Sequence, residues 1–333
     1  MIGIKKTNEK YTNEELESLW SENTISSLVK FYSEVNTPDK AVAFSGARHL
    51  SEVKIYHNNV GTDTCFVIPT MNFDKFRKTT YWNFVSQLDT IIVESNGPYF
   101  NYSHSMNSGI VEVLNYGYSR VILSNDDMIP LSPIGELEEV IRKTINVDII
   151  LPKKIKISEK KIFPIPEEFY IVERNLMERI LTKTYWIKVH KILAKNIIQI
   201  TKNFSDYNYS VFENGGSTPR DLMLRLLLKT KYSHLPLFNS FGIFKTEILH
   251  KAFFDTLFIN GREDYDLVIR LLNKNFIFQY SSFEIADIGG QSLNNYYNNL
   301  RPVKNRLNDL ILNFKLRKLH NKSLLANYRD EVK

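Results

Sequence analysis

The chain has 333 residues, a hydrophobic content of 43% and a net charge of +6, which is typical of a globular protein with a large core and excludes a disordered chain. Its single cysteine, Cys65, excludes an internal disulfide framework and a zinc site built from cysteines. No segment has the apolar length of a membrane span, and the N-terminus lacks the apolar core of a signal peptide, so we expect a cytoplasmic protein.

Residues 1–60 predict a helical N-terminal extension. Thr12 and Glu15 have the spacing of a capping box, and an apolar series follows at Leu16, Leu19, Leu28 and Phe31. This segment carries no chemical motif.

Strands and helices alternate through residues 61–152. Apolar runs predict strands at residues 65–68, 90–93 and 147–151, and from residue 121, while helices are expected at residues 73–88 and 107–116. Cys65 lies in the first of these runs, so we expect a buried, structural thiol. Ser132 and Pro133 predict a further helix start, with serine as the cap and proline in the first helical position. Such alternation predicts an α/β fold with a mostly parallel sheet flanked by helices.

The segment VILSNDDMIP at residues 121–130 reads as a buried strand that runs directly into two carboxylates. Ligands of open α/β sheets bind outside the carboxyl ends of such strands. A divalent cation that carries a diphosphate needs one or two carboxylate ligands, which Asp126 and Asp127 would supply. The alternative is a polar turn, since Asn and Asp are common turn residues.

The pattern changes after residue 152. Residues 153–204 predict a basic helical insertion, whose apolar-striped part at residues 172–204 either docks on its own domain or contacts an anionic membrane surface. Residues 293–333 predict a basic helical tail with a solvated face.

A second acidic element follows Gly261. A helix is expected to begin near Arg262, with Glu263 and Asp264 in its first turn, where the helix dipole favours negative charge. Asp266 and Arg270 have ion-pair spacing, and such a pair contributes at most about 1 kcal/mol when it is exposed. The alternative is that these acids only stabilise the helix start.

Together these segments resemble the GT-A glycosyltransferases of glycosyltransferase family 2, which are inverting nucleotide-sugar transferases. The resemblance spans roughly residues 65–292 and matches residues 153–204 poorly. Its four motifs occur in the order of the family: Val67-Ile-Pro-Thr70, Ile92-Val-Glu94, Asn125-Asp126-Asp127 and the EDYDLVIR segment at residues 263–270. It implies a Rossmann-like GT-A sheet, with residues 61–152 as the nucleotide-sugar-binding half and residues 205–292 as the acceptor-binding half. The glycine-rich ENGGS loop at residues 213–217 would then either close over the acceptor or form a surface turn.

The resemblance also implies roles for individual residues. It makes Asp264 the general base, with Glu263 as the competing candidate, and gives a divalent cation (Mg²⁺ or Mn²⁺) to Asp127 and Asp287. The donor nucleotide would contact Pro69, Thr70, Asn72, Glu94, Asn96, Asn125 and Asp126. The partners implied are a nucleotide-sugar donor and a glycan, lipid-linked or protein acceptor, the lipid-linked case with peripheral membrane contact.

Two positions depart from the family pattern. Asn125 replaces the first carboxylate of the metal motif, and an amide is a weaker cation ligand, so the burden shifts to Asp127. Asp287 falls where many members have a histidine, and it would either act as an oxygen ligand or leave that contact missing.

Three other functions are alternatives to a glycosyltransferase. A sugar nucleotidyltransferase needs a glycine-rich phosphate loop after its first strand, but residues 69–74 contain no glycine. A catalytically inactive nucleotide-sugar-binding or interaction protein of the same fold stays open. No recognisable module supports nucleic-acid binding, so we expect no nucleic-acid partner.

Overall fold

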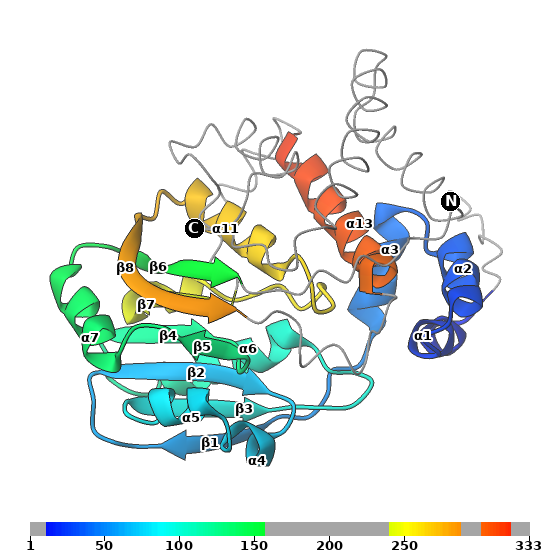
Figure 1. Ribbon diagram of the computed structural model, residues 1–333. Coiled ribbons are helices and arrows are strands. Elements are labelled where there is room, and N and C mark those ends of the chain that lie inside the picture. The colour runs from blue at the N-terminus through cyan, green and yellow to red at the C-terminus, as the bar shows by residue number, and fades with distance from the viewer. Residues whose placement is uncertain (1–10, 157–239, 288–300, 321–333) are drawn as a thin grey trace, which may run out of the picture.

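The computed structural model describes residues 11–156, 240–287 and 301–320 as an α/β fold (Figure 1). Its strands form one eight-stranded sheet in the order β1-β3-β2-β4-β7-β6-β8-β5. They are β1 (Lys54–Asn58), β2 (Thr64–Thr70), β3 (Asp89–Glu94), β4 (Arg120–Ser124), β5 (Met128–Pro130), β6 (Ile149–Lys156), β7 (Phe241–Lys245) and β8 (Phe278–Asp287).

Helices lie before, between and after these strands. The described helices are α1 (Asn13–Ser21), α2 (Ile25–Glu34), α3 (Pro38–Ala47), α4 (Phe73–Phe76), α5 (Thr80–Val85), α6 (Tyr102–Val113), α7 (Ile134–Lys143), the 3₁₀ helix η2 (Thr246–Lys251), α11 (Glu263–Asn273) and α13 (Arg301–His320). The helix expected at residues 73–88 is therefore two short helices. The one expected at residues 107–116 begins earlier, at Tyr102.

The sheet is mixed, so the expectation of a mostly parallel sheet is wrong. β2 pairs in parallel with β3 and β4, and β6 with β8, whereas the β1–β3, β4–β7, β6–β7 and β5–β8 pairs are antiparallel. Parallel neighbours need a crossover of about a dozen residues, which the helices after β2 and β3 supply. Only three residues separate β4 from β5, so β5 joins the sheet elsewhere, beside β8.

Two hydrophobic cores cover the two faces of the sheet. α6 and α11 pack on one face, and α4, α5 and α7 pack on the other. α6 lies unusually close to β2 and β3 because its residue 109 is glycine. A Cβ atom at Gly109 would lie 2.3 Å from Cγ1 of Val67.

A third core joins the two ends of the described chain. Helices α1 to α3 pack with α13 around buried residues that include Trp20, Phe31, Phe44 and Leu310. The Tyr32 hydroxyl donates a hydrogen bond to the Val303 carbonyl at 2.7 Å. The capping box of Thr12 and Glu15 is confirmed, while β1 lies within the segment expected to be a helical extension.

The structure confirms the sequence prediction for Cys65 and contradicts the one for Ser132. Cys65 is fully buried, as predicted, and burial raises its pKa to about 12. The prediction that Ser132 caps α7 is wrong, because Pro133 occupies the N-cap position. The Ser132 hydroxyl instead accepts a hydrogen bond from the Glu284 amide at 3.1 Å. The apolar-striped helices predicted at residues 172–204 and the loop predicted at residues 213–217 lie outside the described residues.

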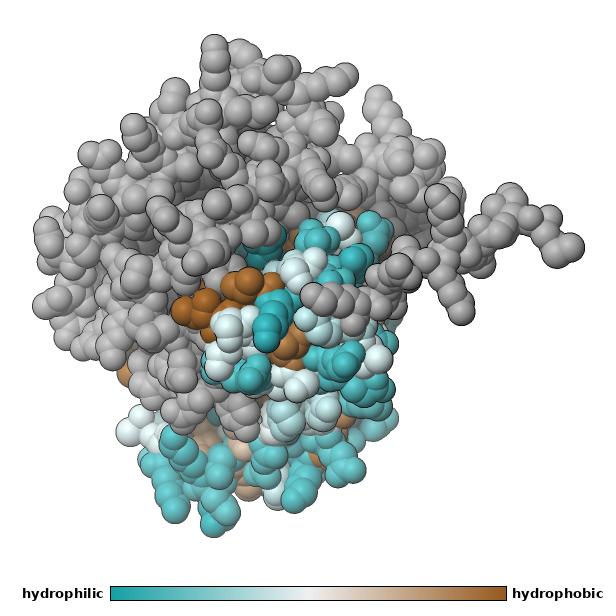
Figure 2. Space-filling view, turned by 90° about the vertical axis from the view of Figure 1, so that its right-hand side faces the viewer, coloured by the Kyte–Doolittle hydropathy of each residue, from teal (hydrophilic) through white to brown (hydrophobic). Residues whose placement is uncertain are grey.

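Figure 2 shows mostly hydrophilic residues on the described part of one face, together with a small hydrophobic patch. Among the helices that the structure describes, none combines the length and the apolar character needed to cross a bilayer.

Candidate functional site

The carboxyl ends of β2, β3 and β4 meet at one edge of the sheet. Thr70 and Glu94, which end β2 and β3, are register partners. Asn125 follows β4 directly, and its amide donates to the Ser240 carbonyl at 2.8 Å, just before β7. The parallel part of the sheet therefore brings the first three motifs to a common edge.

Thr70 connects β2 to the acidic pair after β4. Its hydroxyl donates a hydrogen bond of 2.6 Å to Oδ2 of Asp126 and accepts the Asn72 amide at 3.3 Å. Burial raises the pKa of Asp126, although the Thr70 hydroxyl and the charge of Lys75 oppose the shift. A nearby cation would stabilise the ionised form of this buried carboxylate, because an opposite charge lowers the pKa of a carboxyl group.

Glu94 and Asn72 shape the turn after β2. Oε2 of Glu94 accepts the Phe73 amide at 2.8 Å, and Oδ1 of Asn72 caps α4 by accepting the Lys75 amide at 2.8 Å. A carboxylate offers about four acceptor positions, so Glu94 retains the capacity to bind a further donor. Asn72 is already used as a helix cap, a role that the sequence reading did not assign to it.

Pro69 and Asn96 differ from these residues. Pro69 is buried within β2, beside Val93 and beyond the last described β2–β4 register pair, where its missing N–H costs no bond to β4. Its side chain can make only van der Waals contact with a ligand. Asn96 is exposed, two residues after the end of β3, in the turn where Gly97 has a φ of +91°.

Aromatic rings that the sequence reading missed border this edge. The ring centroids of Tyr56 and Phe73 lie 4.6 Å apart, and those of Phe73 and Trp82 lie 5.5 Å apart. All three side chains are partly exposed, and Phe73 is the residue whose amide Glu94 binds. Partly exposed aromatic side chains beside a carboxylate are a common lining of ligand sites.

The two residues expected to bind a metal, Asp127 and Asp287, are far apart in sequence but lie near each other across the β5–β8 pair. The antiparallel β5–β8 pair places Asp287 opposite Met128, the residue that follows Asp127. Among the described residues, no group of three or more histidine, cysteine, aspartate and glutamate side chains gathers to hold a metal ion. A cation here would therefore rely on one or two carboxylates together with phosphates and water, which is the usual arrangement for Mg²⁺.

The second acidic element begins α11, as expected. Glu263 and Asp264 lie in its first turn, and Oδ1 of Asp264 accepts the Tyr265 amide at 2.9 Å. Arg262, just before the helix, has a φ of +70°, and its guanidinium pairs with Asp309 of α13 at 2.9 Å. At Gly261 a Cβ atom would lie 2.4 Å from Oδ1 of Asn305, so the glycine permits this close approach of α13.

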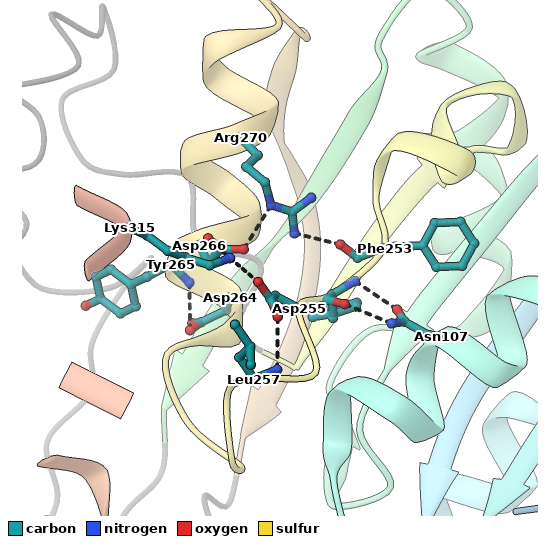
Figure 3. Close-up of polar contacts among 10 residues, drawn as sticks. Asn107, Phe253, Asp255, Leu257, Asp264, Tyr265, Asp266, Arg270 and Lys315 are labelled. Atoms are coloured by element: carbon teal, nitrogen blue, oxygen red, sulfur yellow. Dashed lines mark hydrogen bonds and ion pairs between the residues drawn. The ribbon is translucent and has the colours of Figure 1, made fainter. Parts of the chain in front are cut away.

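Asp266 is buried and lies in a network of partly buried charged side chains (Figure 3). It pairs with Arg270 at 2.9 Å, as its spacing predicts, and with Lys315 of α13 at 2.8 Å; Lys315 also pairs with Asp255. Because the Asp266 side chain is only 6% exposed, the contribution of about 1 kcal/mol given for an exposed pair does not apply. The expected solvated face of the tail is wrong at Lys315 for the same reason.

The two acidic elements act on one tyrosine. Tyr102 begins α6, and burial raises its pKa well above the usual value. The negative charges of Glu263, Asp264, Asp127 and Asp126 raise the pKa further. Residues 126–127 and 263–264 are far apart in sequence, yet both pairs lie near enough to Tyr102 to affect its ionisation.

A separate pocket lies at the opposite edge of the sheet. It has a volume of about 810 Å³, and its lining includes Asp63, Arg120, Glu138 and Lys245. The buried Arg120 guanidinium already donates to the Thr144 and Val147 carbonyls, each at 2.7 Å. None of the residues proposed from the sequence lines this pocket, so it is distinct from the candidate site.

Comparisons with known proteins found that no protein-family model and no curated protein matches this chain.

Proposed function

We propose that this chain is an inverting glycosyltransferase that moves a sugar from a nucleotide donor to a glycan, lipid-linked or protein acceptor. The observation that supports the proposal most is the meeting of Thr70, Glu94 and Asp126 at the carboxyl edge of the sheet, where the Thr70 hydroxyl donates a hydrogen bond of 2.6 Å to Asp126. A direct displacement needs the leaving group and the acceptor on opposite sides of one sugar. In this proposal residues 126–127 serve the leaving group and residues 263–264 serve the acceptor.

The nucleotide would bind at the ends of β2, β3 and β4. Glu94 would accept hydrogen bonds from the ribose or base beside the aromatic rings of Phe73 and Tyr56, and Thr70 holds Asp126 in place. Asn125 would contribute a hydrogen bond to the nucleoside rather than a strong cation ligand. A GT-A assignment of the mixed sheet is part of this proposal.

Asp127 would hold a divalent cation, with Asp287 as a second candidate ligand. The donor set fits a cation that is bound mainly by the phosphates of the donor, since the described residues offer few carboxylates. When bound, such an ion would stabilise the negative charge of the departing nucleoside diphosphate.

Asp264 would remove the proton of the acceptor hydroxyl as that oxygen attacks the anomeric carbon. The Tyr265 amide and the N-terminus of α11 both favour the ionised carboxylate that a base requires. Glu263 is the alternative base in the same helical turn.

Thermal unfolding with a nucleotide panel tests the proposal. UDP, GDP, dTDP and CMP, each with Mn²⁺, should give a higher melting temperature for at least one nucleotide, because a ligand that binds only the folded state stabilises it. The shift should be lost in Asp127→Ala and kept in Glu138→Ala, a variant in the pocket at the other edge. No shift with any nucleotide would reject the assignment.

A further inference from the structure

Tyr81 of α5 is hydrogen-bonded to the end of β4, directly before the acidic pair. Its hydroxyl oxygen lies 2.5 Å from Oγ of Ser124, and the Ser124 hydroxyl donates to the Asn125 carbonyl at 3.0 Å. Tyr81 and Ser124 are both fully buried. Neither was among the site residues proposed from the sequence.

The direction of these hydrogen bonds follows from the number of protons. A serine hydroxyl carries only one proton. Because Ser124 gives this proton to the Asn125 carbonyl, the short contact between Tyr81 and Ser124 requires the tyrosine to be the donor. Burial raises the pKa of Tyr81 far above its ordinary value, so the phenol stays protonated and able to donate. These two hydrogen bonds, from Tyr81 through Ser124 to Asn125, form a hydroxyl relay.

The hydroxyl relay ends on the peptide bond between Asn125 and Asp126. Because a peptide bond is planar, a hydrogen bond to the Asn125 carbonyl also orients the start of Asp126. Two further hydrogen bonds hold the same segment. The Asn125 amide donates to the Ser240 carbonyl at 2.8 Å, and the Thr70 hydroxyl donates to Oδ2 of Asp126 at 2.6 Å. Contacts from α5, from β2 and from the residue before β7 therefore fix Asn125 and Asp126.

The ring of Tyr81 is itself fixed by packing. It stacks with Phe84, with centroids 6.1 Å apart and planes at 14°, and meets Phe76 edge-on at 6.2 Å. Met128, which follows Asp127, belongs to the same hydrophobic core. A side chain that is locked by packing holds its hydrogen-bond partner more precisely than a mobile one does. The hydroxyl relay therefore begins at a rigid donor.

We propose that Tyr81 is a positioning residue, whose hydroxyl acts through Ser124 to orient the acidic pair for a divalent cation and its nucleotide. This inference rests on the proposed function, in which Asp127 holds the cation. A loop that already has its binding geometry loses less conformational entropy when the ligand binds, and so binds it more tightly. Tyr81 would not touch the ligand, because its hydroxyl is buried against Ser124.

Titration calorimetry on the full chain tests this role. Whichever of UDP, GDP, dTDP and CMP stabilises wild type would be titrated, with Mn²⁺, into wild type, Tyr81→Phe and Ser124→Ala. We expect each variant to bind the nucleotide about 3- to 10-fold more weakly, as the loss of one hydrogen bond predicts. If Tyr81→Phe does not fold, Ser124→Ala provides the same test.

The double variant Tyr81→Phe/Ser124→Ala tests whether the two residues act as one relay. Ser124→Ala already removes the connection between Tyr81 and Asn125. The additional loss of the Tyr81 hydroxyl should therefore weaken binding no further, which is the non-additivity expected of residues in one network. Effects that multiply in the double variant would show that the residues act independently and would overturn the relay.

Tyr32→Phe is the matched control for the loss of a buried hydroxyl. Tyr32 is also buried, and its hydroxyl donates to the Val303 carbonyl at 2.7 Å in the core between α1–α3 and α13. Tyr32→Phe should lower the urea midpoint of unfolding as Tyr81→Phe does, but keep the nucleotide affinity within about 2-fold of wild type. Equal weakening by Tyr32→Phe would mean that lost stability, not positioning, reduces the affinity.

The outcomes separate the two proposals. Wild-type affinity in both Tyr81→Phe and Ser124→Ala would overturn the role of Tyr81 and leave the proposed function standing. Failure of wild type to bind any of the nucleotides with Mn²⁺ would overturn the proposed function and the role of Tyr81 with it.

Discussion

Asp264 and Glu263 are adjacent on one helix turn, but their side chains project about 100° apart, so only one should face an acceptor. If Asp264 is the base, Asp264→Asn should reduce sugar transfer by about 10²-fold or more, because a positioned base contributes about 10²–10⁴-fold. Nucleotide binding should stay nearly unchanged. Release of nucleoside diphosphate from the donor, measured with and without acceptor, gives both quantities.

Glu263→Gln is the matched variant, since it keeps the shape of the side chain and removes its basicity. Transfer that survives Asp264→Asn but is abolished in Glu263→Gln would make Glu263 the base. Survival in both variants would mean that the acids only stabilise the start of α11. Nucleotide binding without transfer in wild type would favour the inactive binding protein of the same fold.

Other single residues show the limits of local sequence reading. The ion pair of Asp266 and Arg270 was predictable, because a spacing of four residues brings side chains together on any helix. The burial of that pair depends on Lys315, 49 positions away along the chain. Tyr102 was missed because residues 98–101 carry no apolar period, so the start of α6 was placed too late.

At the scale of elements, Lys315 attaches the C-terminal helix α13 to the proposed base helix α11. It bridges Asp266 of α11 and Asp255, while Arg262 bridges α13 through Asp309. Lys315→Met should lower the free energy of unfolding by at least about 1.5 kcal/mol, because a hydrogen bond to a charged group contributes about 1.5–3 kcal/mol. Urea unfolding measures this loss.

Lys30→Met on α2 is the control for this change, because Lys30 is exposed and no ion pair of its side chain is described. It should change the unfolding free energy by less than about 0.5 kcal/mol. Equal midpoints for wild type and Lys315→Met would contradict a stabilising contact between α13 and α11.

Elements that are specified by nearby residues were predictable from the sequence, whereas those that depend on residues far apart along the chain were not. β2, β3 and β4 were predicted from apolar runs, because a buried strand must be hydrophobic over its own length. The pairing of β7 and β8, which makes the sheet mixed, joins strands that are distant in sequence. The failure of Ser132 to cap α7 has a similar cause, since β8 provides a competing amide.

For the whole molecule, the main structural question is which edge of the sheet binds a ligand. The carboxyl edge holds Thr70, Glu94 and the acidic pair after β4, and the opposite edge holds an open pocket. Sequence motifs favour the first because ligands of α/β sheets bind at carboxyl ends. The position of α11 relative to these strands was not predictable from sequence, because it depends on a core that joins residues far apart along the chain.

Hydrogen exchange with and without the selected nucleotide, in the presence of Mn²⁺, tests the central claim most directly. A bound nucleotide should slow exchange at residues 70–76, 94–97 and 124–128, because it stabilises and covers these segments. Exchange at residues 138–145 and 245–247, around the other pocket, should stay unchanged. Slower exchange confined to those two segments, or no change anywhere in the chain, would contradict a nucleotide-sugar site at the carboxyl edge.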